Sequence, residues 1–418
     1  EHTTYSLSVE YQSTAGIDSS SQIGQNEDDD GYRNNSVSAK VNHHINDSWS
    51  VGVNFTRADG RNEIDRGALT DDYKTDSIQQ ILGLNSSVTI NDYWQVELQV
   101  SESRDKSSNY KNGDADGVFN TRHRFANISN IFKLSTNHIL NVGLDYEVDD
   151  VISSQDFSQT TRDNKAAFIS WQANVDKHSW LVSARHDDNE AFGNYDSGTA
   201  EFGYSLKNNL QVTFNAGTAF KAPTFNDLYY PGFSNPDLQA EKSKSYGIGL
   251  KGYSDNITTW QVQVFNTKVR DLIAYDSTTF SMENINEARI KGIEFDATTN
   301  LYEWDLVFNA TILKPEDETT GNILARRAQR LANIHADKQW GAWSAGTSWK
   351  LRGHSFDNAS NTARLSGYGL VDIRAGYQLD QDWQLQASVS NLLDKEYQTV
   401  NNYNSLDRTF TLTISYKP

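Results

Sequence analysis

Four carboxylates stand side by side near the start of the chain, at Glu27, Asp28, Asp29 and Asp30, and Gly31 follows them. Such charges repel one another, although water and salt screen the repulsion in an exposed loop. A hard cation makes the arrangement favourable, because Ca²⁺ takes six to eight oxygen ligands and a D-x-D spacing before glycine lets alternate carboxylates converge while the chain turns. Asp28 and Asp30 have this spacing.

Further aspartates lie close to this run. Asp18 precedes it in the same polar segment, and the next polar segment, "NEIDRGALTDDYK", contains Asp65 and Asp72. We expect strands at 2–14, 33–45, 49–59 and 76–90, and consecutive antiparallel strands would bring the two segments together at one end of a sheet. The alternative interpretation is a solvated acidic loop without bound metal, and Glu27 and Asp29 are expected to be surface charge in either case.

The elements that must position these residues are strands. In "WQVELQV" the side chains of Trp94, Val96, Leu98 and Val100 share one face, and polar residues occupy the other. The segments "WQLQASVSNL" and "FTLTISY" alternate in the same way. Period-2 alternation over about ten residues predicts amphipathic strands, and we expect about twenty of them.

The connections between the predicted strands alternate in length. Short turns such as "INDSW", "INDYW" and "LDQDW" alternate with long polar connections, which we expect near 15–31, 60–74, 104–118, 149–163, 187–196, 219–240, 315–324, 354–363 and 397–407. Every second connection is therefore tight. This predicts an up-and-down meander that is trimmed at one end and elaborated at the other.

Eight of the ten tryptophans follow or flank the short turns: Trp49, Trp94, Trp180, Trp260, Trp304, Trp340, Trp343 and Trp383. Amphipathic rings gather in this way at the headgroup level of a membrane. A meander of about twenty strands must also close to hide its edges. We therefore predict an all-β fold, a transmembrane antiparallel up-and-down β-barrel in which residues 1–418 form one barrel domain. Hairpin anchoring in a soluble β protein is the alternative.

A barrel of this size has a lumen too wide for side chains to fill. We expect an open or plugged channel with charged residues on its inner face: Glu97, Arg289, Lys291, Glu294, Arg326 and Asp372.

Composition excludes several other classes of protein. The 418 residues carry a formal net charge of −18 and no cysteine, so disulfide scaffolds and thiolate metal sites are excluded. The acidic balance argues against nucleic-acid binding, which needs clustered lysine and arginine. No H-E-x-x-H, G-x-S-x-G or phosphate-loop motif occurs, and the chain is predicted not to be an enzyme.

Three separated segments resemble the barrel signatures of TonB-dependent outer-membrane transporters: "FKAPTFNDLYYPGFSNPDLQAEKS", "NEARIKGIEFDA" and "VSNLLDKEYQTV". Further segments, "RHDDNEAFG", "VRDLIAYD", "ILARRAQ" and "NNYNSLDRTFTLTISY", are similar to the cobalamin transporter subfamily. The resemblance implies active import of cobalamin across the outer membrane of a Gram-negative bacterium. Siderophore or haem import is the runner-up, and a passive porin or adhesin-like barrel is the alternative from another class.

The resemblance also implies partners. That subfamily has a 22-stranded barrel preceded by a plug and an energy-coupling box that TonB grips. We expect the plug, the coupling box and two strands to lie outside this sequence. The TonB complex would act through that missing region, while lipid and lipopolysaccharide would surround an expected monomer.

The same resemblance implies two sets of site residues. Calcium would be held between the first two long loops by Asp18, Asp28, Asp30, Asp65 and Asp72. Cobalamin would be contacted by Asn109 in "SSNYKNG", Arg326 in "LARRAQ" and Tyr403 in "NNYNS". The alternative interpretation of Arg326 is a lumen arginine paired to an acidic strand or plug residue. The alternative for Tyr403 is an exposed loop aromatic. The loop at 354–363 is expected to be shortened.

Overall fold

The computed structural model describes residues 2–22, 27–65, 71–254, 258–276 and 279–417. Its contacts divide the chain into two compact units. The first comprises Glu1–Glu201, Gly217–Ser243 and Asp271–Ile285, and the second comprises Phe202–Ala216, Lys244–Arg270 and Asn286–Pro418.

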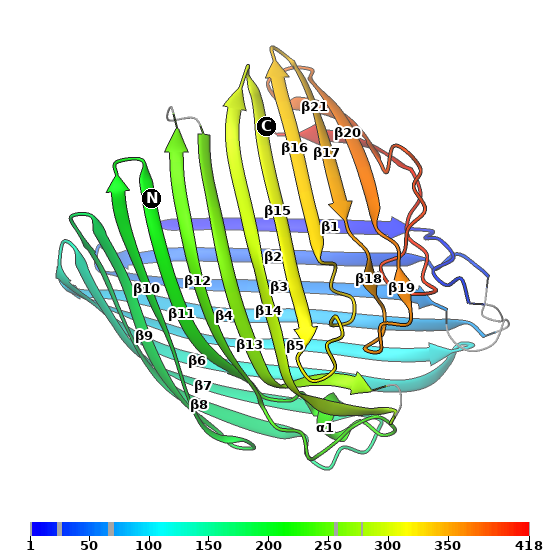
Figure 1. Ribbon diagram of the computed structural model, residues 1–418, viewed down its shortest axis with the longest axis horizontal. Coiled ribbons are helices and arrows are strands. Elements are labelled where there is room, and N and C mark those ends of the chain that lie inside the picture. The colour runs from blue at the N-terminus through cyan, green and yellow to red at the C-terminus, as the bar shows by residue number, and fades with distance from the viewer. Residues whose placement is uncertain (1, 23–26, 66–70, 255–257, 277–278, 418) are drawn as a thin grey trace. The chain divides into compact units, whose positions relative to one another are not determined.

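Almost all regular structure is β-strand, in twenty long strands and a two-stranded ribbon (Figure 1). The strands as far as the only helix of the described part are β1 Thr3–Thr14, β2 Tyr32–Asn46, β3 Trp49–Ile64, β4 Tyr73–Asn91, β5 Trp94–Lys111, β6 Asp114–Ser135, β7 His138–Ser153, β8 Thr161–Val175, β9 His178–Asn189, β10 Gly193–Lys207 and β11 Leu210–Lys221.

The helix α1, Phe225–Tyr229, comes next, and the remaining strands are β12 Glu241–Ser254, β13 Thr258–Asp276, β14 Ser281–Leu301, β15 Trp304–Asp317, β16 Arg330–Trp340, β17 Trp343–Arg352, β18 Ser355–Phe356, β19 Arg364–Leu365, β20 Tyr368–Gln378, β21 Trp383–Ser390 and β22 Thr409–Tyr416. None of the helical residues described belongs to a segment that is long and apolar enough to cross a bilayer.

The strands pair with their neighbours along the chain. In the first unit β1 to β9 form a continuous antiparallel meander, and in the second unit β14 to β17 and β20 to β22 do the same. The predicted all-β fold of about twenty antiparallel strands is confirmed. The prediction of one domain over 1–418 stays a prediction.

The aromatic row at the short turns is also confirmed. Trp49, Trp94, Trp304, Trp343 and Trp383 are the first residues of β3, β5, β15, β17 and β21. Trp94 lies opposite Phe132 across β5 and β6, and their ring centroids are 5.8 Å apart. The short turn therefore sets the position at which each aromatic ring meets its neighbour.

Two of the predicted long connections are strands. β5 and β6 continue through 104–118 and meet in a tight turn at Asn112 and Gly113, which both have positive φ. β9 and β10 likewise occupy most of 187–196. The polar composition of these stretches suggested loops, but strands that extend beyond an apolar band are polar on both faces and still complete their backbone ladder.

Register defines an apolar face and a polar face in each unit. In the first unit Leu84 lies opposite Val100 and Val100 opposite Ala126, while Gln99 lies opposite Asn127 on the polar face. Val100 is 56% exposed and Leu84 51%. Neither of these side chains is buried against protein. An apolar face that is this exposed is normal only where lipid covers it.

The predicted inner-face charges are corrected by this register. Lys291 lies opposite Lys314, two residues from the pair Ile293 and Ile312, and therefore belongs to the apolar face, as does Arg289. Glu294 lies on the polar face, opposite Thr311. Arg326 belongs to the connection between β15 and β16 and not to a strand. The charge of these residues suggested the lumen, but parity within the strand decides the face.

Candidate functional site

Three of the predicted aspartates converge on the backbone of Ser19 and Ser20. The Ser19 amide donates to Oδ2 of Asp30 over 3.0 Å, and the Ser20 amide donates to Oδ1 of Asp18 over 3.1 Å and to Oδ2 of Asp65 over 3.0 Å. The Ser19 hydroxyl adds a 3.3 Å contact to Asp65. The two polar segments predicted to meet are therefore joined through these hydrogen bonds.

Asp65 is the electrostatically unusual member of the group. Its burial, together with the charges of Asp30 and Asp18, raises the pKa of its carboxyl to about 6. Its Oδ1 atom is buried and has no hydrogen-bond partner in the part of the chain that the structure describes. A buried carboxylate oxygen without a donor is an unsatisfied acceptor that a cation could complete.

The backbone of the acidic loop holds Asp30 in place. Gly16 has φ +83°, and a Cβ there would lie 1.8 Å from the carbonyl oxygen of Asp30. The Asp30 amide in turn donates to the carbonyl of Ile17 over 3.0 Å. Only glycine allows this close approach of 16 to 30.

Asp28 and Asp72 are not part of the converging group. Asp28 is exposed and has neither a hydrogen bond nor an ion pair with the described residues. Asp72 lies 3.1 Å from the Lys74 ammonium, which also contacts Glu63 at 3.2 Å. No set of three or more acidic or histidine residues among those described is arranged so that it could hold a metal ion. Asp18, Asp30 and Asp65 offer carboxylate oxygens, which is the donor type that Ca²⁺ takes, but as described they do not form a metal site.

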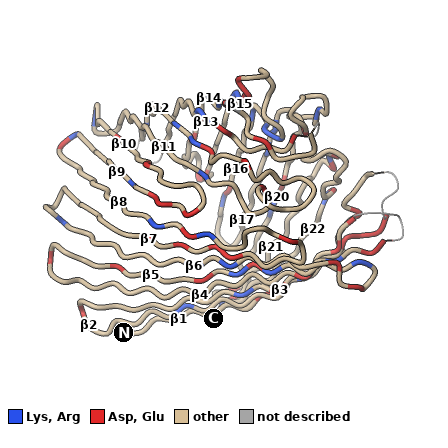
Figure 2. Tube along the Cα trace, turned by 90° about the horizontal axis from the view of Figure 1, so that it is seen from below, with Lys and Arg blue, Asp and Glu red and all other residues tan. Residues whose placement is uncertain are grey.

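Glu63 was not identified from the sequence. Its Oε2 accepts a hydrogen bond from the Gly31 amide over 3.0 Å, and its Oε1 contacts Lys74, so it ties the acidic loop to the start of β4. Nothing in the spacing of Glu63 marks this role, because the contact spans 32 residues. Figure 2 shows acidic residues gathered at this end of β1 to β4.

Asn109 lies in β5 of the first unit, where the sequence suggested a loop. Its side-chain oxygen accepts a hydrogen bond from the Thr75 hydroxyl over 2.8 Å, and a bulge follows it in the pairing with β6. The cross-strand bond fixes the amide and leaves its nitrogen available as a donor.

Arg326 lies in the second unit and has φ +60°. Its Nε donates to Oδ1 of Asp357 over 2.7 Å, while its amide donates to the carbonyl of Phe356 over 2.6 Å. Arg352 donates to the carbonyl of Arg326. Arg326 is thus paired with an acidic residue, but the partner comes from the loop at 354–363 and not from a strand or plug. The side chain is still 56% exposed, so its remaining donors can bind a ligand.

Tyr403 lies in the second unit, in the connection between β21 and β22, and is 45% exposed. Its amide donates to the carbonyl of Val400 over 3.3 Å. The same connection is braced where Arg408 contacts Asp394 at 3.1 Å. An exposed ring on a braced loop is suited to stacking against a planar ligand.

A serine and a histidine, Ser348 and His335, are in contact in the second unit. His335 Nδ1 lies 3.0 Å from the Ser348 hydroxyl, but Arg374 donates to the same hydroxyl over 2.9 Å. Asp337 pairs with Arg374, and no described carboxylate contacts His335. The pair thus lacks the orienting third group of a hydrolytic triad.

The sequence of this chain is similar to that of vitamin B12 transporters over most of its length. The vitamin B12 transporter BtuB of Photobacterium profundum is 29% identical over 401 residues, which cover 94% of this chain and 66% of that protein. The chain thus spans just under two thirds of that relative's length. A ferric enterobactin receptor mutant, PfeA of Pseudomonas aeruginosa, has the same fold, with a TM-score of 0.83 and 14% identity over 100% of this chain and 75% of its own.

The copper transporter OprC has a TM-score of 0.84 and 15% identity, over 99% of this chain and 76% of its own. The family described as TonB dependent receptor-like, beta-barrel, matches residues 2–392. The chain therefore belongs to the family of TonB-dependent-receptor-like outer-membrane β-barrels.

Proposed function

We propose that this chain forms the barrel wall of a TonB-dependent importer of cobalamin in the outer membrane of a Gram-negative bacterium. The observation that carries the proposal is the similarity to a vitamin B12 transporter over 94% of the chain. Substrate would cross within the barrel and meet Asn109, Arg326 and Tyr403 from its wall and loops. The TonB complex would be its partner, and the protein would work as a monomer surrounded by lipid and lipopolysaccharide.

We further propose that Ca²⁺ orders the first two long loops before substrate binds. Asp18, Asp30 and Asp65 would supply carboxylate oxygens, and the unsatisfied Oδ1 of Asp65 supports this assignment. Asp28 and Asp72 would join them when the loops close. The ion would offset the mutual repulsion of these carboxylates and so hold the loops in one arrangement.

The role of the chain is transport and not catalysis. The Ser348 hydroxyl beside His335 is shared with Arg374, which supports this view. Arg326 would donate to polar groups of the ligand, and Tyr403 would stack on its planar part.

Binding of cyanocobalamin to outer-membrane vesicles tests the proposal. We expect binding to fall when EGTA removes calcium. Without EGTA, binding should also be weaker in Asp30→Asn and Asp65→Asn than in the unmodified protein, because each variant removes a charged ligand. Asp92→Asn is the matched control, since Asp92 lies exposed in a short turn at the other end of its strands. Equal binding with and without EGTA contradicts the calcium proposal. Failure to bind any corrinoid contradicts the substrate and would favour a siderophore or haem receptor.

A further inference from the structure

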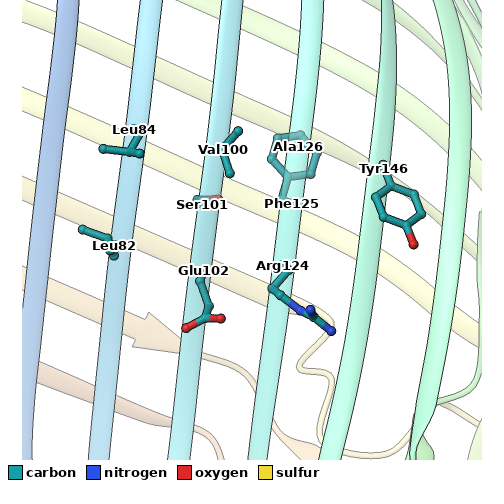
Figure 3. A pocket seen from close by; sticks show the side chains of 9 residues that line it. All are labelled: Leu82, Leu84, Val100, Ser101, Glu102, Arg124, Phe125, Ala126 and Tyr146. Carbon is teal, nitrogen blue, oxygen red and sulfur yellow. The ribbon is translucent and has the colours of Figure 1, made fainter.

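A groove on the apolar face of the first unit ends at Glu102 and Arg124 (Figure 3). Arg104 and Arg122 lie beside them across β5 and β6. The groove encloses about 270 Å³, and its apolar lining includes Leu82, Leu84, Val100 and Tyr146. Glu102 and Arg124 close its end toward the turn between β5 and β6. The floor is therefore suited to hydrocarbon and the end to a charged group.

Two of the arginines face each other directly. Arg104 on β5 lies opposite Arg122 on β6, and Arg124 is the next residue of β6 on the same face. Like charges directly opposite in an antiparallel pair are unfavourable unless an anion lies between them. The side chains of Arg122 and Arg124 are 43% and 46% exposed, so an anion can reach them.

Neighbouring carboxylates do not neutralise the cluster. Glu102 pairs with Arg104 at 2.5 Å, and one oxygen of Asp150 serves both Arg122 at 3.1 Å and Arg124 at 2.9 Å. Three guanidinium groups thus meet two carboxylates, and most of their N–H groups have no acceptor among the described residues. The exposed Lys106 lies on the same face and adds a further positive charge.

The cluster lies at a definite height on the barrel wall. Arg104 is ten residues from Trp94, and Arg122 is ten residues from Phe132, which is the partner of Trp94. Ten residues of a strand tilted by about 45° rise about 24 Å, close to the roughly 25 Å apolar band of an outer-membrane barrel. The tryptophan row marks one interface of the membrane, so the arginines lie at the other.

The second unit repeats this arrangement independently. Lys291 lies opposite Lys314 across β14 and β15, next to Ile293 and Ile312, and Arg330 lies opposite Ile312 on β16. These residues line a cavity of about 460 Å³. Lys314 is ten residues from Trp304, and Lys291 is ten residues from Leu301, the partner of Trp304. Lys314 pairs with Glu316 at 2.5 Å, whereas Lys291 has no ion pair with a described residue.

We propose that each cation cluster binds the phosphate group of a membrane lipid in the outer leaflet, with the acyl chains along the apolar groove beside it. The guanidinium group of arginine can donate two parallel hydrogen bonds to a pair of phosphate oxygens, and the ammonium group of lysine adds a positive charge beside the same phosphate. The apolar floor and the height of the clusters favour a lipid over a soluble anion. The inference uses the outer-membrane location of the family and is independent of the imported substrate.

Lipid retention by the whole detergent-purified protein tests this site. Native mass spectrometry would compare lipid A, which carries two phosphates, with phosphatidylcholine. Each cation near an anionic lipid contributes about a factor of five, so the variant Arg104→Gln/Arg122→Gln should hold lipid A about thirtyfold more weakly at its site. Lys291→Gln/Lys314→Gln should weaken the second site in the same way, and Glu102→Gln should strengthen the first.

The matched control is Lys40→Gln/Lys350→Gln, which removes two exposed cations from the polar face. It should retain lipid as the unmodified protein does, and heat-modifiable mobility on gels would verify that every variant is folded. Equal retention of lipid A by the arginine variant, or equal retention of phosphatidylcholine, would overturn the proposal. Displacement of lipid A by millimolar inorganic phosphate would instead assign a soluble-anion site.

Discussion

At the scale of single residues, Asp65 connects the geometry of the acidic loops to solution chemistry. Its carboxyl is partly buried beside Asp30 and Asp18, and this raises its pKa to about 6. A proton and a cation therefore compete for the same oxygens. Without calcium, protonation of Asp65 stabilises the joined loops at low pH, and this contribution is lost as the pH rises through about 6.

We predict that calcium binding weakens as the pH falls below about 6 and releases protons near that pH. Titration calorimetry at pH 5 and pH 7.5, in buffers of different ionisation enthalpy, measures both effects. In Asp65→Asn the calcium-free loops should resist protease better at pH 7.5, because the repulsion is gone, while calcium should no longer add protection. A calcium affinity that is unchanged between the two pH values would contradict this assignment.

The residue contacts show where prediction from sequence stopped. The order of the strands was sufficient to predict that the two polar segments meet, and they do so through Asp18, Asp30 and Asp65. The D-x-D spacing also predicted that Asp28 converges with Asp30, which the structure does not show. The ties made by Glu63 to Gly31 and by Asp357 to Arg326 were not predictable. Each depends on which of several nearby side chains meets a loop after folding, and no local pattern encodes that choice.

At the scale of elements, alternation predicted the strands well and their ends poorly. The expected strands 2–14 and 33–45 agree with β1 and β2, whereas β3 runs to Ile64 and β4 begins at Tyr73. Within the lipid band one face must be apolar, so the period-2 signal is strong. Beyond the lipid band both faces of the strand contact water, so the period-2 alternation disappears. The sequence of such a strand end then resembles that of a polar loop.

The connection between β1 and β2 depends on Gly16, and two glycines allow a controlled test of this. Gly16 and Gly113 have φ values of +83° and +88°, but a Cβ at Gly113 meets nothing within 4 Å. Both alanine variants incur the left-handed strain of roughly 1–2 kcal/mol, and only Gly16→Ala adds a clash with Asp30.

We predict that Gly16→Ala weakens calcium binding at least tenfold, since a further loss of about 1.4 kcal/mol from the clash corresponds to a factor of ten. Gly113→Ala should leave calcium affinity unchanged. Calorimetric titration of both variants, with strand content verified by circular dichroism, makes the comparison. Equal losses in the two variants would show that strain alone, and not the approach of 16 to 30, is responsible.

At the scale of the whole molecule, the two faces of the barrel wall have different surroundings: lipid on the apolar face and water on the polar face. The large exposed residues of the apolar face, among them Leu84, Val100 and Ile312, would destabilise a protein dissolved in water. Lipid removes that cost, and water on the polar face hydrates Gln99 and Asn127. The fold, the aromatic row and the cation clusters at the opposite height all follow from this division of faces.

The division of faces is also the part of the fold that the sequence predicted best, because every strand repeats it. The prediction was wrong for Lys291 and Arg289, because their charge was taken as evidence that they face the lumen. Under the lipid proposal those residues lie at the outer interface, where long cationic side chains reach headgroups while their stems cover apolar surface. Side-chain chemistry alone could not separate a lumen charge from an interface charge, and the register did.

Spin labelling tests this division of faces most directly, since a chain without cysteine accepts single labels cleanly. Single cysteines at Val96, Leu98 and Val100, and at Glu97 and Gln99, would be labelled in protein reconstituted into lipid. Oxygen, which partitions into lipid, should relax the labels at 96, 98 and 100, and a water-soluble nickel chelate should relax those at 97 and 99. The opposite alternation, or equal exposure of all five labels to the chelate, would contradict the account.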